Sequence, residues 1–271
     1  MSRSSRRHRR PPAVDTAVGH AEVVADHARP GAASLLIDGF VHGHHDPTDP
    51  GRLTLDYQAR LTAIVLAFVP TGPARVLHLG GGAFAIPRAL AVANPDLTQT
   101  IVEKSAAIIG LAQRELGLRR SDRLVVRKGD ARTVLGRLPT GSADVVVGDA
   151  FVGHDTPPQL VTVQAMTEVR RVMGPTGRYV INIIDHQPWG KLAVQAAAAM
   201  EVFADVVAMG SRGVARLRDP GNVFLIASDT ALPRTALTAA GARCSHPAAL
   251  VSDGRLTDLT RGTRPRHDCD G

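Results

Sequence analysis

Aromatic residues are scarce in this sequence, which has one Trp, two Tyr and six Phe among its 271 residues. Proteins that bind single-stranded nucleic acid stack its bases on aromatic side chains, so this composition argues against a surface that binds single strands by stacking. Cysteine is also rare, and Cys244 and Cys269 stand far from any metal-ligand spacing. We therefore predict two free thiols in a reducing compartment and no metal site.

Long apolar runs are absent as well. No stretch approaches the roughly 20 apolar residues that a membrane-spanning helix needs. The arginine-rich start of the chain leads into Pro11-Pro12 and mixed residues, and not into the apolar core of a secretory signal. Together these features predict a cytoplasmic protein that does not enter a membrane.

Acidic residues are missing from the first 12 positions, which contain five arginines. The chain has a net charge of +7, so the remaining residues carry only +2. Because the basic character is local and no apolar periodicity accompanies it, we interpret residues 1–31 as a disordered basic arm. Such an arm contacts nucleic acid through charge alone, and specific nucleic-acid binding is not expected.

The rest of the chain alternates between two hydrophobic periods, and with 44% hydrophobic residues it can bury one sizeable core. This alternation predicts an α/β, Rossmann-like fold with about seven mostly parallel strands and an antiparallel edge. Strands are predicted from residue 75 and over 100–103, 124–127, 143–147, 179–184, 205–208 and 223–227, and helices over 56–69, 84–93, 105–116, 132–138, 159–173 and 190–203.

A small β cap is predicted before this domain, over residues 32–56. Its strands lie near residues 34–41 and 53–55. Three histidines in it, His42, His44 and His45, have no partner at a ligand spacing, so we expect them to be surface residues. The predicted organisation is the arm (1–31), the cap (32–56), the Rossmann-like domain (57–232) and a C-terminal extension (233–271).

The most informative stretch is the glycine turn after the strand that begins at Arg75. Gly80, Gly81 and Gly82 follow an apolar run and lead into a helix, which is how an α/β sheet meets a nucleotide. Gly80 can adopt a positive φ in the tight turn, Gly82 lets the backbone approach a ligand, and Ala85 lets helix and strand touch. We predict a nucleoside-binding turn here.

Three carboxylates end the next strands. Glu103 comes 21 residues after Gly82, the spacing at which a βαβ unit delivers an acid to a ribose diol. Asp130 follows Gly129 and could accept a hydrogen bond from an adenine amino group, or cap the helix that follows. Asp149 ends the fourth strand, where a carboxylate could deprotonate a nucleophile. Ligands of open α/β sheets bind at these strand ends.

Together these motifs resemble the spermidine synthase (polyamine aminopropyltransferase) family, within the class I S-adenosylmethionine-dependent methyltransferase fold. The resemblance covers roughly residues 34–230. The residues that carry it are Gly80, Gly81, Gly82, Glu103, Gly129, Asp130, Asp149 and the pair Tyr57-Gln58, which stands where the family has a Tyr-Gln pair.

The resemblance implies a transferase of polyamine biosynthesis that uses S-adenosylmethionine or its decarboxylated form, without a metal. It implies that Glu103 binds the ribose hydroxyls, Asp130 the adenine amino group, and Asp149 the attacking amine. A small-molecule amine is then the expected substrate, with Tyr57 and Gln58 beside it. A homodimer is compatible with this interpretation.

The sequence departs from the family at two acidic positions. Ala83 follows the glycine turn where the family has an Asp that holds the donor's ammonium, and Val152 replaces the second acid of the loop after strand four. Asp155 and Asp185 are the acids that remain near these positions, and Asp185 is a candidate substrate residue. Two alternative functions stay open: a small-molecule methyltransferase and a non-catalytic nucleoside-binding module.

Overall fold

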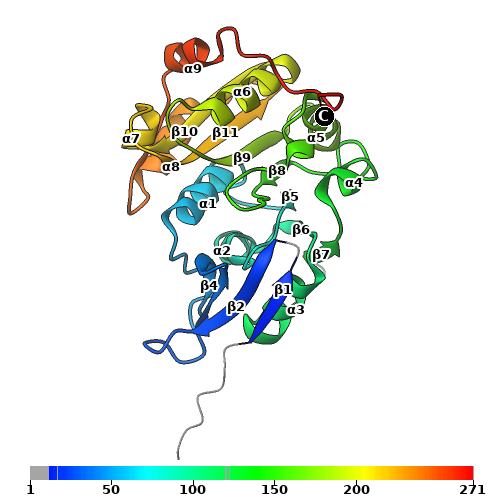
Figure 1. Cartoon of the computed structure of the whole chain (residues 1–271), viewed down its shortest axis with the longest axis vertical. Coiled ribbons are helices and arrows are strands. Elements are labelled where there is room, and N and C mark those ends of the chain that lie inside the picture. The colour runs from blue at the N-terminus through cyan, green and yellow to red at the C-terminus, as the bar shows by residue number, and fades with distance from the viewer. Residues whose placement is uncertain (1–11, 17, 120, 122, 271) are drawn as a thin grey trace, which may run out of the picture.

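Two β-sheets organise the chain in the computed structural model, which describes residues 12–16, 18–119, 121 and 123–270 (Figure 1). A four-stranded sheet comes first, and an eight-stranded sheet carries the rest. The strands of the large sheet are β5 (Arg75–Leu79), β6 (Thr98–Glu103), β7 (Leu124–Lys128), β8 (Val145–Gly148), β9 (Arg178–Asp185), β10 (Asp205–Ser211), β11 (Gly221–Ser228) and β12 (Ala248–Leu250).

The large sheet has the strand order β12-β10-β11-β9-β8-β5-β6-β7. Strands β5 to β9 pair in parallel, whereas β11 runs antiparallel to both β9 and β10. The predicted α/β fold with an antiparallel edge is confirmed, and each of the seven predicted strands is present. The eighth strand, β12, has only three residues, too few to show a hydrophobic period in the sequence.

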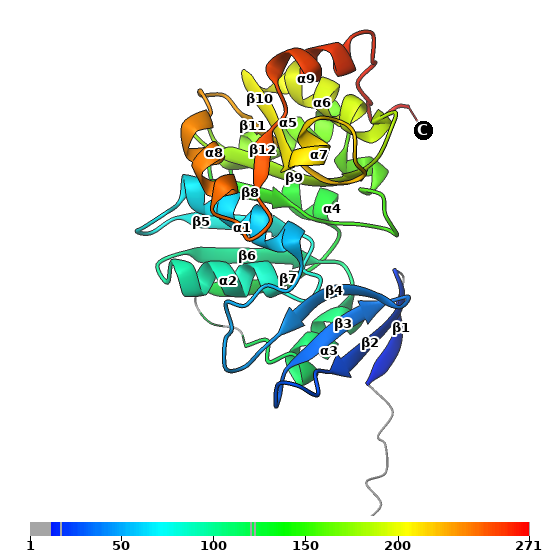
Figure 2. The same ribbon diagram turned by 90° about the vertical axis from the view of Figure 1, so that its left-hand side faces the viewer.

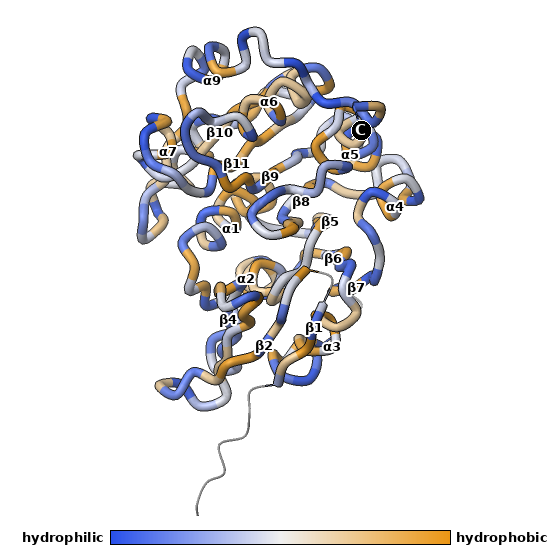
Figure 3. Tube along the Cα trace, viewed as in Figure 1, coloured by the Kyte–Doolittle hydropathy of each residue, from blue (hydrophilic) through white to orange (hydrophobic). Residues whose placement is uncertain are grey.

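Helices cover both faces of this sheet, as the hydrophobic clusters show. Helices α1 (Asp56–Phe68), α2 (Ala85–Ala93) and α8 (Arg234–Ala242) pack on one face, and α5 (Val163–Met173), α6 (Gly190–Val202) and α9 (Asp253–Thr260) on the other. Helix α6 lies between the sheet and α9, and most of it is hydrophobic in Figure 3, as expected for a helix covered on two sides. The other helices of the described residues are α3 (Ala106–Glu115), α4 (Ala131–Leu135), η1 (Pro158–Leu160) and α7 (Arg212–Ala215).

The small sheet, which we call the cap, is an antiparallel meander of β1 (Ala13–Thr16), β2 (Gly19–Ala25), β3 (Ala33–Ile37) and β4 (Phe40–His45). Figure 2 shows it beside α3 at one end of the molecule. Its inner face is apolar, and buried Leu35 and Ile37 pack in one cluster with Ile108 of α3. The cap is therefore fixed to the domain by hydrophobic burial.

The predicted boundary of the basic arm at residue 31 is wrong, because β1 occupies residues 13–16 and β2 residues 19–25. In β2 the alternating residues Ala21 and Val23 are buried, and polar neighbours face outward. This alternation is too short to stand out beside the arginines. Residues 1–11 lie outside the described residues, so that part of the prediction is untested.

Two further predictions for the cap are wrong. No strand forms over residues 53–55. His44 and His45 are buried, because the end of β4 packs on α2, and His44 Nδ1 lies 3.0 Å from Ser34 Oγ.

Among the described residues, no helix combines the length and hydrophobicity that crossing a membrane requires.

Candidate active site

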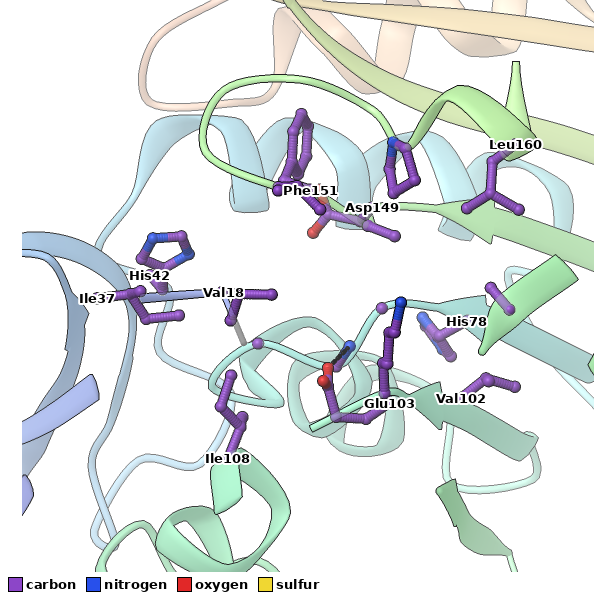
Figure 4. Close-up of a pocket in the computed structure, with 18 of the residues that line it drawn as sticks. Val18, Ile37, His42, His78, Val102, Glu103, Ile108, Asp149, Phe151 and Leu160 are labelled. Carbon is purple, nitrogen blue, oxygen red and sulfur yellow. Dashed lines mark hydrogen bonds between the residues drawn. The ribbon is translucent and has the colours of Figure 1, made fainter. Parts of the chain in front are cut away.

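A cavity of about 440 Å³ opens where β5, β6, β7 and β8 end, beneath the cap (Figure 4). Its wall has three parts: the glycine turn after β5, the polar ends of the neighbouring strands, and side chains that the cap contributes. Of the ten predicted site residues, nine line this cavity: Tyr57, Gln58, Gly80, Gly81, Gly82, Glu103, Gly129, Asp130 and Asp149.

The glycine turn brings β5 against the end of β8. Gly80 has a φ of +104°, as predicted, and its N–H donates to the Val102 carbonyl at 2.9 Å. A Cβ at Gly80 would lie 2.5 Å from the carbonyl oxygen of Asp149, closer than side chains approach. The absence of a side chain here therefore allows the turn and Asp149 to share one wall of the cavity.

Glu103 ends β6 and is oriented by two backbone amides. Its Oε2 accepts from Gly81 N at 3.0 Å, and its Oε1 accepts from Ser105 N at 2.8 Å. The side chain is buried at the cavity wall. A carboxylate offers about four lone-pair sites, so two acceptor sites remain for a ligand with two adjacent hydroxyls.

Asp130 caps the following helix, one of the two roles that the sequence left open, and its two oxygens have different contacts. Oδ1 caps α4 by accepting from Arg132 N at 3.0 Å and Thr133 N at 3.2 Å. Oδ2 lies 3.4 Å from Gln159 Nε2 and 3.6 Å from Lys104 Nζ, and all of these residues except the two capped ones line the cavity. The hydrogen bonds to the start of α4 fix the carboxylate of Asp130, and its Oδ2 is left beside the ligand space.

Asp149 lies across the cavity from Glu103 (Figure 4). A chain of amides holds it: Asn222 Nδ2 donates to Asn182 Oδ1 at 3.0 Å, and Asn182 Nδ2 donates to Asp149 Oδ1 at 2.8 Å. Asn182 lies on β9 and Asn222 on β11, two strands that pair antiparallel with Asn222 opposite Ile184 and Asn182 opposite Phe224. The orientation of the carboxylate is therefore set by the two neighbouring strands.

Burial raises the pKa of Asp149 to about 7, and the hydrogen bond from Asn182 opposes this shift. The phenol of Tyr57 has its pKa raised by burial and by the charge of Asp149, so it stays protonated. Gln58 Nε2 contacts Tyr57 Oη at 3.2 Å and the His42 carbonyl at 3.1 Å. The site thus combines a carboxylate that titrates near neutral pH with a permanently protonated phenol, which suits proton transfer from a nucleophile.

We expect the turnover of a reaction that uses Asp149 as a base to rise with pH through a limb near pH 7, as the carboxylate ionises. Asn182→Ala removes a hydrogen bond that stabilises the ionised form, so it should raise this pKa and move the limb to higher pH. The measurement is kcat against pH with both substrates saturating. Asn222→Ala keeps the direct donor to Asp149 and should move the limb less. Coincident profiles for wild type and Asn182→Ala would contradict this role.

Asp185 is the predicted site residue that does not line the cavity. Its oxygens accept from the N–H groups of His186 and Leu192, both at 2.8 Å, so it orders the turn between β9 and α6. The prediction that it contacts substrate is therefore not supported by its position. Asp155 also lies outside the lining and pairs with Lys191 at 2.5 Å.

Ala83 is likewise buried away from the cavity lining. It packs directly against the backbone of β4: a Cβ on Gly43 would lie 2.6 Å from the Ala83 Cβ. A larger side chain at position 83 has no room unless the cap moves. Alanine at this position is thus tied to the close approach of the cap.

Sequence reasoning missed several residues that shape the site. Asn182 and Asn222 sit inside hydrophobic strands, and a polar amide in such a strand was the available signal. The cap contributes Val18 and Ile37 to the cavity wall. His78 on β5 contacts Gln99 Oε1 through Nε2 at 2.9 Å, and burial lowers its pKa to about 4, so it stays neutral.

The chain resembles known proteins in both sequence and structure. No family model matches the chain. Over 141 residues, 51% of the chain, the sequence is 32% identical to a polyamine aminopropyltransferase of Vibrio vulnificus. The matched stretch covers 46% of that protein, so it spans about half the length of this curated relative.

The solved structures give a match over nearly the whole chain. A probable spermidine synthase from Corynebacterium glutamicum is 26% identical, with a TM-score of 0.85 over 96% of this chain and 97% of that one. The chain has a spermidine synthase-like fold. Human methyltransferase-like protein 13, solved with SAH, is 17% identical, with a TM-score of 0.57 over 80% of this chain and 97% of that one. The spermidine synthase-like chain therefore also shares the methyltransferase fold, as the sequence predicted.

Proposed function

We propose that the chain is an aminopropyltransferase that uses decarboxylated S-adenosylmethionine and a small-molecule amine. The single observation that carries this proposal is the placement of Asp149, a partly buried carboxylate with a pKa near 7, across one cavity from Glu103. One end of this cavity offers acceptors for a nucleoside, and the other offers a base. The names of the Vibrio and Corynebacterium proteins support the same reaction.

In the proposed reaction the neutral amine nitrogen attacks the aminopropyl carbon bonded to the sulfonium. The new C–N bond forms as the C–S bond breaks, and the bonding pair stays on sulfur to give neutral methylthioadenosine. The attacking nitrogen then carries a positive charge and releases a proton, which Asp149 accepts and passes to water. Tyr57 Oη, with its proton retained, is positioned to hold the nitrogen near the carboxylate.

The nucleoside end supplies position and desolvation. Ribose hydroxyls would donate to Glu103, and the adenine amino group to Asp130 Oδ2. Aliphatic side chains line the cavity around these two acids, among them Ile86, Val102, Ile108, Pro157 and Leu160. Such apolar walls with a few placed acceptors are typical of pockets for small ligands.

Calorimetric titration tests the proposal. Methylthioadenosine and decarboxylated S-adenosylmethionine should bind, and an amine added to the second complex should release methylthioadenosine. Binding of S-adenosylmethionine with methyl transfer, and no turnover of the decarboxylated donor, would contradict the proposal and favour a methyltransferase. A homodimer and the absence of specific nucleic-acid binding remain predictions.

A further inference from the structure

We infer that the acceptor end of the cavity is built for an amine with a single amino group and an apolar body, and not for a diamine. This inference rests on the proposed aminopropyl transfer. It is carried by the distribution of carboxylates and exposed apolar side chains around the cavity.

Within the described part of the chain, four carboxylates line the cavity, and two belong to its nucleoside end. Glu103 is held by the amides of Gly81 and Ser105, and Asp130 caps α4. Asp149 is required as the base for the reacting nitrogen. Asp38 alone remains for a second ammonium group.

Asp38 is poorly suited to that task. It lies in the exposed turn between β3 and β4, and its Oδ1 already accepts from His20 N at 2.8 Å. An ion pair at an exposed position contributes little, because water solvates both charges. A second ammonium drawn into the cavity would therefore lose solvation without a buried counter-charge to offset the loss.

The mouth of the cavity is instead apolar. Phe40 of the cap is 61% exposed and Val152, in the loop after β8, is 55% exposed, and both line the cavity together with Phe151. The ring of Phe40 meets His154 edge-on at a centroid distance of 5.6 Å, so the cap and this loop touch at the mouth. An apolar acceptor body would remove these side chains from water, which is favourable in proportion to the area covered.

The imidazole of His42 lies at the same end of the cavity (Figure 4). Its pKa is lowered by burial and by the nearby His154, so it is neutral at neutral pH. It can accept a hydrogen bond from the reacting nitrogen but supplies no negative charge. The acceptor end thus has one partly buried carboxylate, neutral polar groups and an apolar rim.

The sharpest test compares putrescine with n-pentylamine, which replaces the distal ammonium by a methyl group at the same chain length. The readout is kcat/KM for methylthioadenosine release at one pH with the decarboxylated donor saturating. We expect n-pentylamine to be used at least tenfold better. A preference for putrescine would overturn this inference and leave the proposed function standing.

Three variants locate the preference. Val152→Asp puts a carboxylate at the exposed rim and removes an apolar contact, so it should raise kcat/KM for putrescine relative to n-pentylamine by about two- to fivefold, the scale of an exposed ion pair. Val41→Asp is the matched control, because Val41 is 44% exposed on β4 but outside the cavity lining; it should not change the ratio. Asp38→Asn should also leave the ratio unchanged, and a selective loss of putrescine turnover in it would overturn the inference.

The remaining outcome concerns the proposed function itself. If the decarboxylated donor binds but no amine releases methylthioadenosine, the aminopropyl transfer fails and this inference fails with it. Methylthioadenosine affinity, measured on each variant, separates a change in acceptor preference from damage to the nucleoside end. We expect that affinity to stay within twofold of wild type in all three.

Discussion

Asp149→Asn should lower turnover by roughly a hundredfold or more, the usual contribution of a positioned general base. Asparagine keeps the size of the side chain and an oxygen that can accept from Asn182, so the amide chain from β9 and β11 persists. It cannot accept a proton from an amine at neutral pH. The measurement is kcat under saturating substrates, with methylthioadenosine affinity as evidence that the cavity is intact.

The stability of this variant gives a second, independent readout. Because the pKa of Asp149 is raised to about 7 in the folded protein, folding favours the protonated form. The stability that this group contributes is complete below the pKa of the unfolded chain, near 4, and is lost as pH rises from there to about 7. A neutral asparagine avoids that loss, so at pH 8 the variant should melt at or above the temperature of wild type.

Asp155→Asn is the matched control, since Asp155 lies in the same loop but outside the cavity lining. It should retain full turnover. Full activity of Asp149→Asn with normal melting would instead assign Asp149 a purely structural role. An inactive variant that has lost methylthioadenosine binding would show a damaged cavity and would not support a catalytic role.

Glu103→Ala should weaken methylthioadenosine binding by about 2 kcal/mol or more, the scale of hydrogen bonds to a charged group. Two causes add. The ligand loses its acceptor for the ribose hydroxyls, and the amides of Gly81 and Ser105 lose the carboxylate that they now share. Calorimetric titration of the folded variant measures the change.

Two further variants separate these causes. Glu103→Gln keeps one acceptor oxygen and should fall between wild type and alanine. Glu115→Ala removes an exposed acid of α3 outside the cavity lining and should bind as wild type does. Unchanged affinity of Glu103→Ala would remove Glu103 from the nucleoside site and leave it as a residue that orders the glycine turn.

Much of the fold could be predicted because its signals are local. A strand or a helix shows its period within a few neighbouring residues, and the glycine turn needs a positive φ at Gly80 whatever surrounds it. The carboxylates at the ends of β6, β7 and β8 followed from the same logic, since parallel strands end at one edge of a sheet. Elements with short or mixed signals, such as β2 and β12, were missed.

Asp185 shows the limit of this reasoning. Like Asp149, it ends a strand of the large sheet, and the sequence gives no ground for separating the two acids. In the structure the carboxylate of Asp185 accepts hydrogen bonds from the backbone amides of His186 and Leu192, whereas Asp149 faces the cavity. Which strand-end acid reaches a ligand depends on the turn that follows, and that turn is fixed by the packing of the next helix.

The α/β class, the strand that carries the glycine turn and the acids that end the neighbouring strands could be read from the sequence, because each rests on residues adjacent in the chain. The chemistry proposed for Asp149 depends instead on contacts between distant parts of the chain. Its amide support comes from Asn182, 33 positions later, and from Asn222, 40 positions beyond that. The pKa of Asp149 depends on burial, and this burial arises only when the strand ends and the cap together enclose the cavity.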